Sequence, residues 1–338
     1  MAFIYETTVD PEADQNSHAF ALDLVGYNKH VLEVGCATGY FTKVLHERGC
    51  TVVGIELDAD AAAVADKWAE RVVVGDLDAG ELWAELDGEQ FDAVTFGDVL
   101  EHLRDPLGTL RAAVRHLKPS GMVVISVPNI AHGDVRLSLL DGRFTYNDTG
   151  LLDRTHVHFF TKASLYAMIR QAGLVLIETR RVAMPLFHSE LGVRRDEFPQ
   201  STVNAILEDP EAETYQFVVK AVPDNGTRSM TTLAQQVIDL SDEAHAEVVR
   251  TALLHKQLRD AEQEIGALHS ARRDQERARH ALAAARGEIA ELQRRVAEVE
   301  RQNQAIHSTR TFRVLSPFRR AYGRLRRDTA PRQTPEAR

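Results

Sequence analysis

Short apolar runs rich in β-branched residues alternate with amphipathic stretches along the first 180 residues. The runs are continuously apolar, which is typical of strands buried on both faces of a parallel sheet. Strands are predicted at residues 30–34, 51–56, 71–75, 91–96 and 122–127. Helices are predicted between them at residues 40–48, 59–69, 80–86 and 106–117. This alternation predicts an α/β fold, a Rossmann-like doubly wound sheet with crossover helices.

A second block follows an irregular stretch at residues 128–161. It predicts a helix at 161–172 and two further strands at 174–182 and 214–222, which bring the sheet to seven strands as an antiparallel pair. The stretch between those two strands holds three prolines at positions 183–210 and receives no assignment.

The last third of the chain has a helical pattern. Residues 230–304 contain no proline, and apolar residues recur there at spacings of three and four in two runs that are out of phase across residues 271–280. This indicates a broken coiled coil, with a single solvated helix as the alternative. The predicted organisation is a catalytic domain at 1–222, a linker at 223–229, a helical coiled-coil region at 230–304 and a basic, partly disordered tail at 305–338.

Charge and cysteine content narrow the class of protein. The formal charge is −10, and residues 305–338 carry nine Arg against two acidic residues, or +7, so the remainder is −17. An acidic body argues against nucleic acid as a partner. The two cysteines form neither a disulfide framework nor a zinc motif.

With no secretory leader and no apolar run of the ~20 residues that span a bilayer, a cytoplasmic protein is expected. The aromatic, arginine-rich segment 308–327 predicts peripheral contact with an anionic membrane, at the inner membrane face.

The strongest local motif is VLEVGCATGYFT at residues 31–42, where a buried strand enters a glycine-bearing loop and then a helix. Bare backbone and a helix N-terminus suit a nucleotide-like ligand. A dinucleotide fingerprint requires G-x-G-x-x-G, but counting from Gly35 places Ala37 and Tyr40 at the second and third positions. An NAD-dependent epimerase or dehydrogenase is therefore disfavoured.

The loop Gly35–Ala37–Gly39 resembles motif I of class I S-adenosylmethionine-dependent methyltransferases, and departs from it at Ala37, where that family usually has glycine. The family's other motifs follow in order, including FDAVTFGDVLEHL at 91–103 and LKPSGMVVISVPN at 117–129. The resemblance covers about half the chain, is to the methyltransferase-23 or ubiquinone-methyltransferase-like group and to polysaccharide-associated methyltransferases, and implies S-adenosylmethionine as cofactor. It assigns these residues to cofactor binding: Glu33, Gly35, Cys36, Ala37, Gly39, Tyr40, Glu56, Leu57, Gly75, Asp76, Leu77, Gly97 and Asp98.

Particular roles follow from the same resemblance. Glu56 is expected to accept hydrogen bonds from the ribose hydroxyls, with helix capping as the alternative. Asp76 is expected to meet the adenine amino group, although an acidic loop residue also binds local backbone. Glu33 contacts the cofactor or caps the loop, and Cys36 is interpreted as a small packing residue and not as a nucleophile.

Methyl transfer to a hydroxyl requires alignment and a base, for which histidine is suited. The candidates are His102 in DVLEHL, and His156 and His158 in DRTHVHFFT. The alternative is that His102 packs beneath the substrate and the other two fill the sheet edge. In ubiquinone-type O-methyltransferases a similar Glu-His pair has been associated with a divalent metal, and Glu101 and His102 match it. No metal site is predicted from the sequence.

The segment LLDRTHVHFFT at 151–161 resembles one found in bacterial methyltransferases of polysaccharide and lipid biosynthesis. The function predicted is methyl transfer to a small-molecule or sugar acceptor, as O-methylation in cell-envelope glycan synthesis. The helical region is expected to form a coiled-coil homo-oligomer or to dock onto a glycosyltransferase. Two alternatives stay open: a methionine-biosynthesis methyltransferase-like protein, suggested by SVPNIAHGDVR at 126–136, and a scaffold with a vestigial methyltransferase fold.

Overall fold

The computed structural model describes residues 16–224, 226, 228–270 and 275–308. Two compact units make up the chain, Met1–Ser241 and Asp242–Arg338. The proposed boundaries of the catalytic domain, linker, helical region and tail stay predictions.

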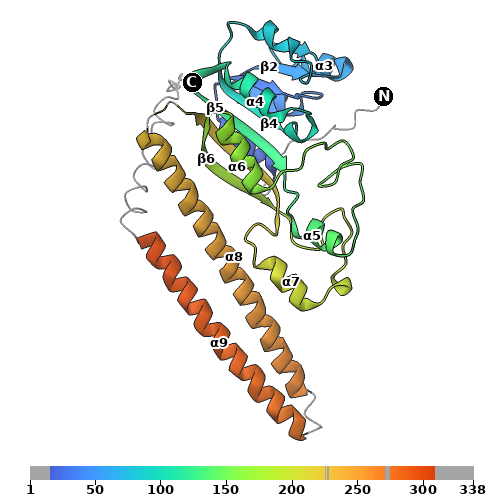
Figure 1. Ribbon diagram of the computed structural model, residues 1–338, viewed down its shortest axis with the longest axis vertical. Helices are drawn as coiled ribbons and strands as arrows, with labels where there is room; N and C mark the ends of the chain where they lie inside the picture. The colour runs from blue at the N-terminus through green and yellow to red at the C-terminus, as the bar shows by residue number, and fades with distance from the viewer. Residues whose placement is uncertain (1–15, 225, 227, 271–274, 309–338) are drawn as a thin grey trace, which may run out of the picture. The chain divides into compact units, whose positions relative to one another are not determined.

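A seven-stranded sheet of order β3-β2-β1-β4-β5-β7-β6 forms the centre of the first unit (Figure 1). Strands β1 to β5 pair in parallel, whereas β7 is antiparallel to both of its neighbours. The usual dinucleotide-binding order is 3-2-1-4-5-6, so β7 is an added strand between β5 and β6. The predicted Rossmann-like, doubly wound seven-stranded fold is confirmed. The strands are β1 His30–Val34, β2 Thr51–Glu56, β3 Arg71–Val74, β4 Phe91–Gly97, β5 Leu117–Pro128, β6 Leu174–Ala183 and β7 Thr214–Pro223.

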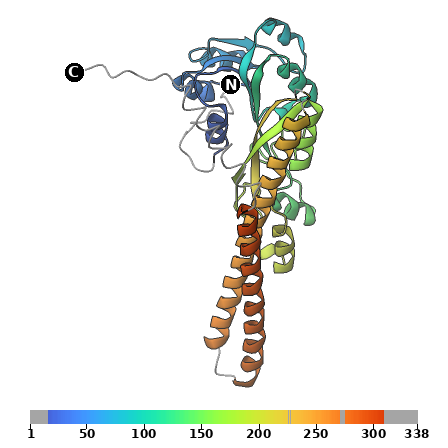
Figure 2. The ribbon, with the colours of Figure 1, turned by 90° about the vertical axis from the view of Figure 1, so that its left-hand side faces the viewer.

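Helices cover both faces of the sheet. Successive residues of a strand point to opposite faces, so neighbouring residues pack in different cores. Val31 packs in one core with α1 (Ser17–Val25) and α2 (Tyr40–Glu47). Its neighbour Leu32 packs in the other. Figure 2 shows the sheet between these two helix layers. The second layer contains η1 Glu81–Leu86, α4 Pro106–Val114 and α6 Lys162–Gln171.

The structure differs from the sequence prediction in several elements. The predicted helix at 80–86 is a 3-10 helix. Helix α1 was not predicted, and it begins because the Asn16 side chain accepts hydrogen bonds from the amides of His18 and Ala19. The stretch at 128–161, expected to be irregular, contains α5 Gly133–Leu140, and the unassigned stretch at 183–210 contains η3 Arg195–Glu197 and α7 Gln200–Leu207. A further 3-10 helix, η2 Leu100–His102, lies between the predicted strand at 91–96 and the predicted helix at 106–117. Helix α3 Ala59–Ala65 contacts β2 and β3.

The two predicted helical runs are α8 (Arg228–Ser270) and α9 (Gln275–Ser308). Within the second unit Leu254 of α8 packs against an apolar strip on α9 formed by Leu292, Val296 and Val299. These are the residues of the repeating pattern, so within one chain part of that pattern is buried between the two helices. Self-association of two chains through them stays a prediction. In the described part of the chain no helix is both long and apolar enough to cross a membrane, and the basic segment lies almost entirely outside the described residues.

Candidate active site

The loop after β1 has a backbone that requires glycine. Gly35 and Gly39 both have left-handed backbone angles, with φ of 74° and 80°. A Cβ on Gly39 would lie 2.7 Å from the Cα of Ala65, and one on Gly35 would lie 2.5 Å from Cγ2 of Val99. Ala37 also has a positive φ, 46°, so the residue that departs from motif I holds the conformation of the glycine it replaces.

Glu56 at the end of β2 fastens this loop. Its Oε2 accepts a hydrogen bond from the Ala37 amide at 2.8 Å, and its Oε1 accepts from the amides of Leu57 and Asp58, both at 2.9 Å. The Glu56 carboxylate therefore orders the turn. The predicted hydrogen bonds from the ribose hydroxyls to Glu56 would add to these three backbone bonds. That role of Glu56 stays a prediction.

Glu33 lies on β1, inside the sheet. It is 5% exposed, and its Oε2 accepts a 2.7 Å hydrogen bond from the hydroxyl of Thr42, which is itself fully buried. Burial raises the pKa of Glu33 to about 8, a rise opposed by the Thr42 hydroxyl and aided by the negative charge of Glu56. Cys36 packs against Gly54, and burial raises the pKa of its thiol, which agrees with a packing role.

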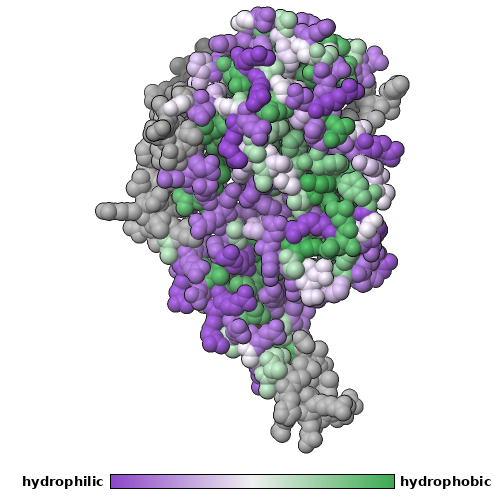
Figure 3. All heavy atoms as spheres, viewed as in Figure 1, coloured by the Kyte–Doolittle hydropathy of each residue, from purple (hydrophilic) through white to green (hydrophobic). Residues whose placement is uncertain are grey.

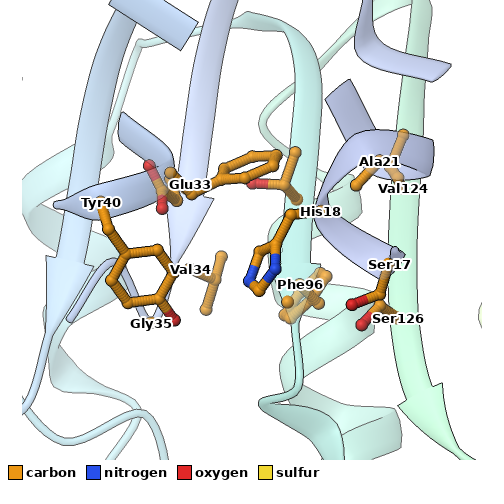
Figure 4. Close-up of a pocket in the computed structure, with 13 residues that line it drawn as sticks. Ser17, His18, Ala21, Glu33, Val34, Gly35, Tyr40, Phe96, Val124 and Ser126 are labelled. Carbon is orange, nitrogen blue, oxygen red and sulfur yellow. The ribbon is translucent and has the colours of Figure 1, made fainter. Parts of the chain in front are cut away.

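A pocket opens beside this loop (Figure 4). Of the predicted cofactor residues, Glu33, Gly35, Tyr40 and Gly97 line it. The Tyr40 ring meets the ring of His18 edge-on across the pocket, with centroids 5.5 Å apart. Burial raises the pKa of the Tyr40 hydroxyl.

Sequence reasoning missed part of this wall. The other lining residues come from α1, α2, β1, β4 and β5: Ser17, His18, Ala21, Val34, Phe41, Thr95, Phe96, Val124 and Ser126. The Asn16 cap preceding a short apolar helix was the available signal for α1.

The remaining predicted cofactor residues lie along the same edge of the sheet, where the parallel strands end. The Asp76 side chain is exposed and accepts a hydrogen bond from the Asp78 amide, so it closes a local turn. Gly75 and Leu77 flank it, and the Leu57 side chain is 68% exposed.

Asp98 follows β4 with a left-handed φ of 55°. Its Oδ1 accepts a 2.7 Å hydrogen bond from the pocket residue Ser126 and another from the Gln216 side chain. Burial lowers the pKa of His18, and the negative charge of Asp98 opposes this change. Burial raises the pKa of Glu101, and the charge of Asp98 adds to this rise. Asp98 therefore lies between the pocket and a second group of residues.

That second group joins η2 to the segment 151–161. Glu101, His102 and His156 each offer a ligand atom, and these atoms lie within 4.8 Å of one another. The rings of His102 and His156 meet edge-on with centroids 4.8 Å apart. The backbones are joined as well, because the amides of Val157 and His158 both donate to the Glu101 carbonyl at 2.9 Å.

The hydrogen bonds of Thr155 determine which ring nitrogen of the neutral His102 side chain carries the proton. The Thr155 hydroxyl donates to Asp153 Oδ1 at 2.6 Å, so toward His102 Nδ1, 3.1 Å away, it can only accept. The Thr155 carbonyl, 3.3 Å from the same nitrogen, is also an acceptor. The neutral His102 ring therefore carries its proton on Nδ1 and its lone pair on Nε2.

His156 and His158 differ sharply in environment. His156 is 9% exposed, and burial lowers its pKa, an effect that the neighbouring His102 reinforces. His158 is exposed, and its Nε2 lies 3.1 Å from the Arg104 carbonyl, to which it donates. The structure thus brings two of the three predicted catalytic histidines together and places His158 outside the cluster.

Glu101 and His102 fit the metal that the resemblance implies. Glu101 is 1% exposed, and neither of its carboxylate oxygens has a hydrogen-bond partner. Burial raises the pKa of Glu101 well above its ordinary range. A buried carboxylate without partners is the kind of group that a cation satisfies.

A family model described as a methyltransferase domain matches residues 5–179, slightly more than half of the chain. The chain belongs to this family. It carries a methyltransferase domain with the seven-stranded sheet described above. We name the glycine loop after β1 and the pocket beside it the cofactor side, after the role predicted for them from the sequence. We name the group of Glu101, His102 and His156 the acceptor-side cluster.

Relatives of this methyltransferase include ubiquinone biosynthesis O-methyltransferases. That of Hydrogenovibrio crunogenus is 34% identical over 154 residues, which are 45% of this chain and 64% of the relative. That of Pseudomonas fluorescens strain Pf0-1 is 38% identical over 155 residues, 44% of this chain and 65% of the relative. The chain thus covers less than two thirds of either relative.

Solved methyltransferases align with 62% and 63% of the chain in two examples. A SAM-dependent methyltransferase from Archaeoglobus fulgidus is 17% identical, with a TM-score of 0.46 over 63% of this chain and 94% of its own. The 1,6-didemethyltoxoflavin-N1-methyltransferase of Burkholderia thailandensis is 21% identical, with a TM-score of 0.40 over 62% of this chain and 78% of its own.

Proposed function

We propose that this methyltransferase transfers the methyl group of S-adenosylmethionine to a hydroxyl oxygen of a small-molecule acceptor. The observation that carries the proposal is the orientation of His102, whose Nε2 lone pair is fixed by Thr155 and Asp153. A hydroxyl must lose its proton as the oxygen attacks the methyl carbon, and the sulfur leaves as a neutral thioether. A preoriented imidazole on η2, which follows the pocket strand β4 in the chain, supplies the proton acceptor.

Asp98 supports the same reaction electrostatically. It borders the pocket through Ser126 and acts on Glu101 through its charge. A carboxylate at this point favours the positive sulfonium of the bound cofactor and an imidazolium formed on the acceptor side.

The surroundings of His156 suit a ring-shaped acceptor. The His156 ring lies 6.2 Å from that of Phe159, and Phe144 lies 6.1 Å from Phe159 and 5.4 Å from Tyr146. Phe144 and Tyr146 are 42% and 49% exposed. Figure 3 shows hydrophobic residues gathered on the face of the molecule where α5 lies. Aromatic walls with a few polar groups are typical of small-molecule sites.

We propose a sugar intermediate of cell-envelope glycan synthesis as the acceptor, on the resemblance of the segment 151–161 to that of polysaccharide-associated enzymes. The names of the relatives favour a second candidate, a hydroxyl of an intermediate in ubiquinone biosynthesis. Both are O-methylations and place the same demand on His102.

The test is incubation of the full chain with methyl-labelled S-adenosylmethionine and a panel of nucleotide sugars and catechols, followed by mass analysis of the products. We expect an O-methylated product, with kcat of His102→Gln about 10²- to 10⁴-fold lower. Cofactor affinity of that variant should match the wild type. A product methylated on nitrogen, sulfur or carbon, or unchanged turnover by His102→Gln, would contradict the proposal.

The partner expectations stay proposals as well. Coiled-coil self-association or docking onto a glycosyltransferase would use faces of α8 and α9 other than the strip buried between them. Contact with an anionic membrane would use the basic tail, whose residues 309–338 lie outside the described part. Sedimentation of the chain with and without anionic vesicles tests both.

A further inference from the structure

The loop after β3 and the segment after η2 are joined by one side chain. The Asp78 carboxylate accepts hydrogen bonds from the Arg104 amide, at 3.0 Å through Oδ1 and 3.2 Å through Oδ2, and from the Asp105 amide at 3.4 Å through Oδ1. The two donors lie 26 and 27 positions further along the chain, so these are tertiary contacts. Hydrogen bonds to a carboxylate are roughly twice as strong as those between neutral groups. Asp78 therefore fixes the backbone that follows η2.

The same backbone is held by a second side chain, that of His158. The peptide unit between Arg104 and Asp105 donates its N–H to Asp78, and its carbonyl oxygen accepts a hydrogen bond from Nε2 of His158 at 3.1 Å. The N–H and C=O of a trans peptide point in opposite directions. Asp78 and His158 therefore reach this one peptide unit from opposite edges, and His158, although outside the acceptor-side cluster, has a contact of its own with the segment after η2.

Helix η2, which carries the proposed base, lies directly before this peptide unit. Within η2 the Glu101 carbonyl accepts hydrogen bonds from the amides of Val157 and His158, both at 2.9 Å. The segment 151–161 thus contacts η2 through its backbone and the residues after η2 through the His158 side chain. Asp78 holds those residues from the loop after β3. A continuous chain of hydrogen bonds therefore runs from that loop to the segment 151–161.

The first member of this chain of hydrogen bonds belongs to the predicted adenine loop. The Asp78 amide donates to Asp76 Oδ1 at 2.9 Å, so the side chain expected to meet the adenine amino group lies in the same turn as the side chain that holds Arg104. Asp76, Asp78, Ala79 and Gly80 are all exposed, and a turn whose hydrogen bonds are exposed to solvent opens easily. A ligand bound at Asp76 would order this turn and with it the bond from Arg104 to Asp78.

We propose that Asp78 and His158 are positioning residues that couple the cofactor side to the acceptor side through the peptide unit between Arg104 and Asp105. An occupied adenine loop orders Asp78, Asp78 holds this peptide unit, and the peptide unit holds His158 together with the segment 151–161. Cofactor binding and the order of that segment are then linked, and such linkage is reciprocal, so an ordered segment also favours the bound cofactor. Only the consequence for proton removal by the proposed base rests on the proposed function.

Hydrogen exchange of the full chain, with and without saturating S-adenosylhomocysteine, tests the coupling at the amides of Val157 and His158. Both amides donate to the Glu101 carbonyl and not to Asp78, so a change there reports transmission and not the removed contact itself. The ligand should increase protection of both amides at least about 5-fold in the wild type. It should leave protection unchanged in Asp78→Ala. Asp78→Asn keeps an oxygen that can accept from the Arg104 amide and should restore part of the increase.

His158 provides the test from the other end. His158→Ala should lose the ligand-dependent protection at Val157, whereas His158→Gln keeps a side-chain donor and should restore part of it. Glu85→Ala is the matched control, since Glu85 is an exposed carboxylate on η1, and it should behave like the wild type. Equal free energies of unfolding in urea show that the variants are folded.

Two results would overturn the proposal. One is the same ligand-dependent protection at Val157 in Asp78→Ala as in the wild type. The other is the absence of any such protection in the wild type. Because no acceptor is present in these measurements, failure of O-methylation would not affect either result.

Discussion

The cofactor side and the acceptor side of the active site differ in how their carboxylates are satisfied. Glu33 takes a hydrogen bond from Thr42, and Glu56 takes three from backbone amides. Glu101, which is more deeply buried than either, takes none. The carboxylates of the cofactor side are therefore satisfied by side-chain and backbone donors, whereas the hydrogen-bonding capacity of Glu101 on the acceptor side is left unfilled. Substitutions on each side test this difference.

The largest effect is expected for Gly39→Ala on the cofactor side. The added Cβ would lie 2.7 Å from a backbone atom of Ala65, and φ is 80°. We expect a loss of about 2 to 5 kcal/mol in the free energy of unfolding from left-handed strain and overpacking. Affinity for S-adenosylmethionine should fall with it. Urea denaturation and calorimetry measure the two quantities.

Gly173→Ala is the control for this substitution. Gly173 has a φ of 76°, but nothing lies within 4 Å of its added Cβ. The Gly173→Ala variant should lose only about 1 to 2 kcal/mol in the free energy of unfolding. It should bind S-adenosylmethionine like the wild type. Similar losses in both variants would mean that the loop is not held by contact with Ala65.

Glu33→Gln probes the satisfied carboxylate through pH. A folded pKa of about 8, above the ordinary 4.5, means that the folded state keeps a proton that the unfolded state has released between these values. The wild type therefore loses stability as pH rises from 4.5 to 8, at most about 1.4 kcal/mol per unit. The amide of the Glu33→Gln variant does not titrate. Its free energy of unfolding relative to that of the wild type should therefore rise by about 3 to 5 kcal/mol between pH 4.5 and pH 8. Urea denaturation at pH 5 and pH 8.5 measures the change, and parallel pH profiles would argue against it.

Thr155→Val should give the smallest effect, on the acceptor side. Removing the hydroxyl breaks the link between Asp153 and His102 while leaving the Thr155 carbonyl in place. We expect kcat to fall about 10-fold and its pH profile to shift, with cofactor affinity unchanged. Thr155→Ser keeps the hydroxyl and should restore both. A loss in kcat shared by the two variants would indicate packing instead of orientation.

The prediction of the fold from sequence succeeded where the signal was local. Continuous apolar runs marked the strands, since a strand buried on both faces leaves no polar alternation. Helix α5 was missed because its start depends on His132, whose side chain caps it at Asp134 and also contacts the Met184 carbonyl, 52 residues away. A contact between residues so far apart in the sequence produces no periodic pattern of apolar residues from which the helix could be predicted.

The same distinction applies to the site. The residues around Gly35 are contiguous, so their spacing alone pointed to the cofactor loop. His102 and His156 were each proposed from their own motifs, but no pattern places residues 54 positions apart in one cluster. Their meeting depends on how the segment 151–161 docks onto η2. His18 was missed because α1 is short and its apolar face is ordinary for a packing helix.

The position of β7 also has a consequence for synthesis on the ribosome. Gln216, on this strand, braces Asp98 from 118 residues further along the chain. A nascent polypeptide that has emerged only as far as β6 already contains the glycine loop and the three residues of the acceptor-side cluster, yet the Gln216 brace does not exist. The chain must therefore be extended past β7 before Asp98 gains that brace.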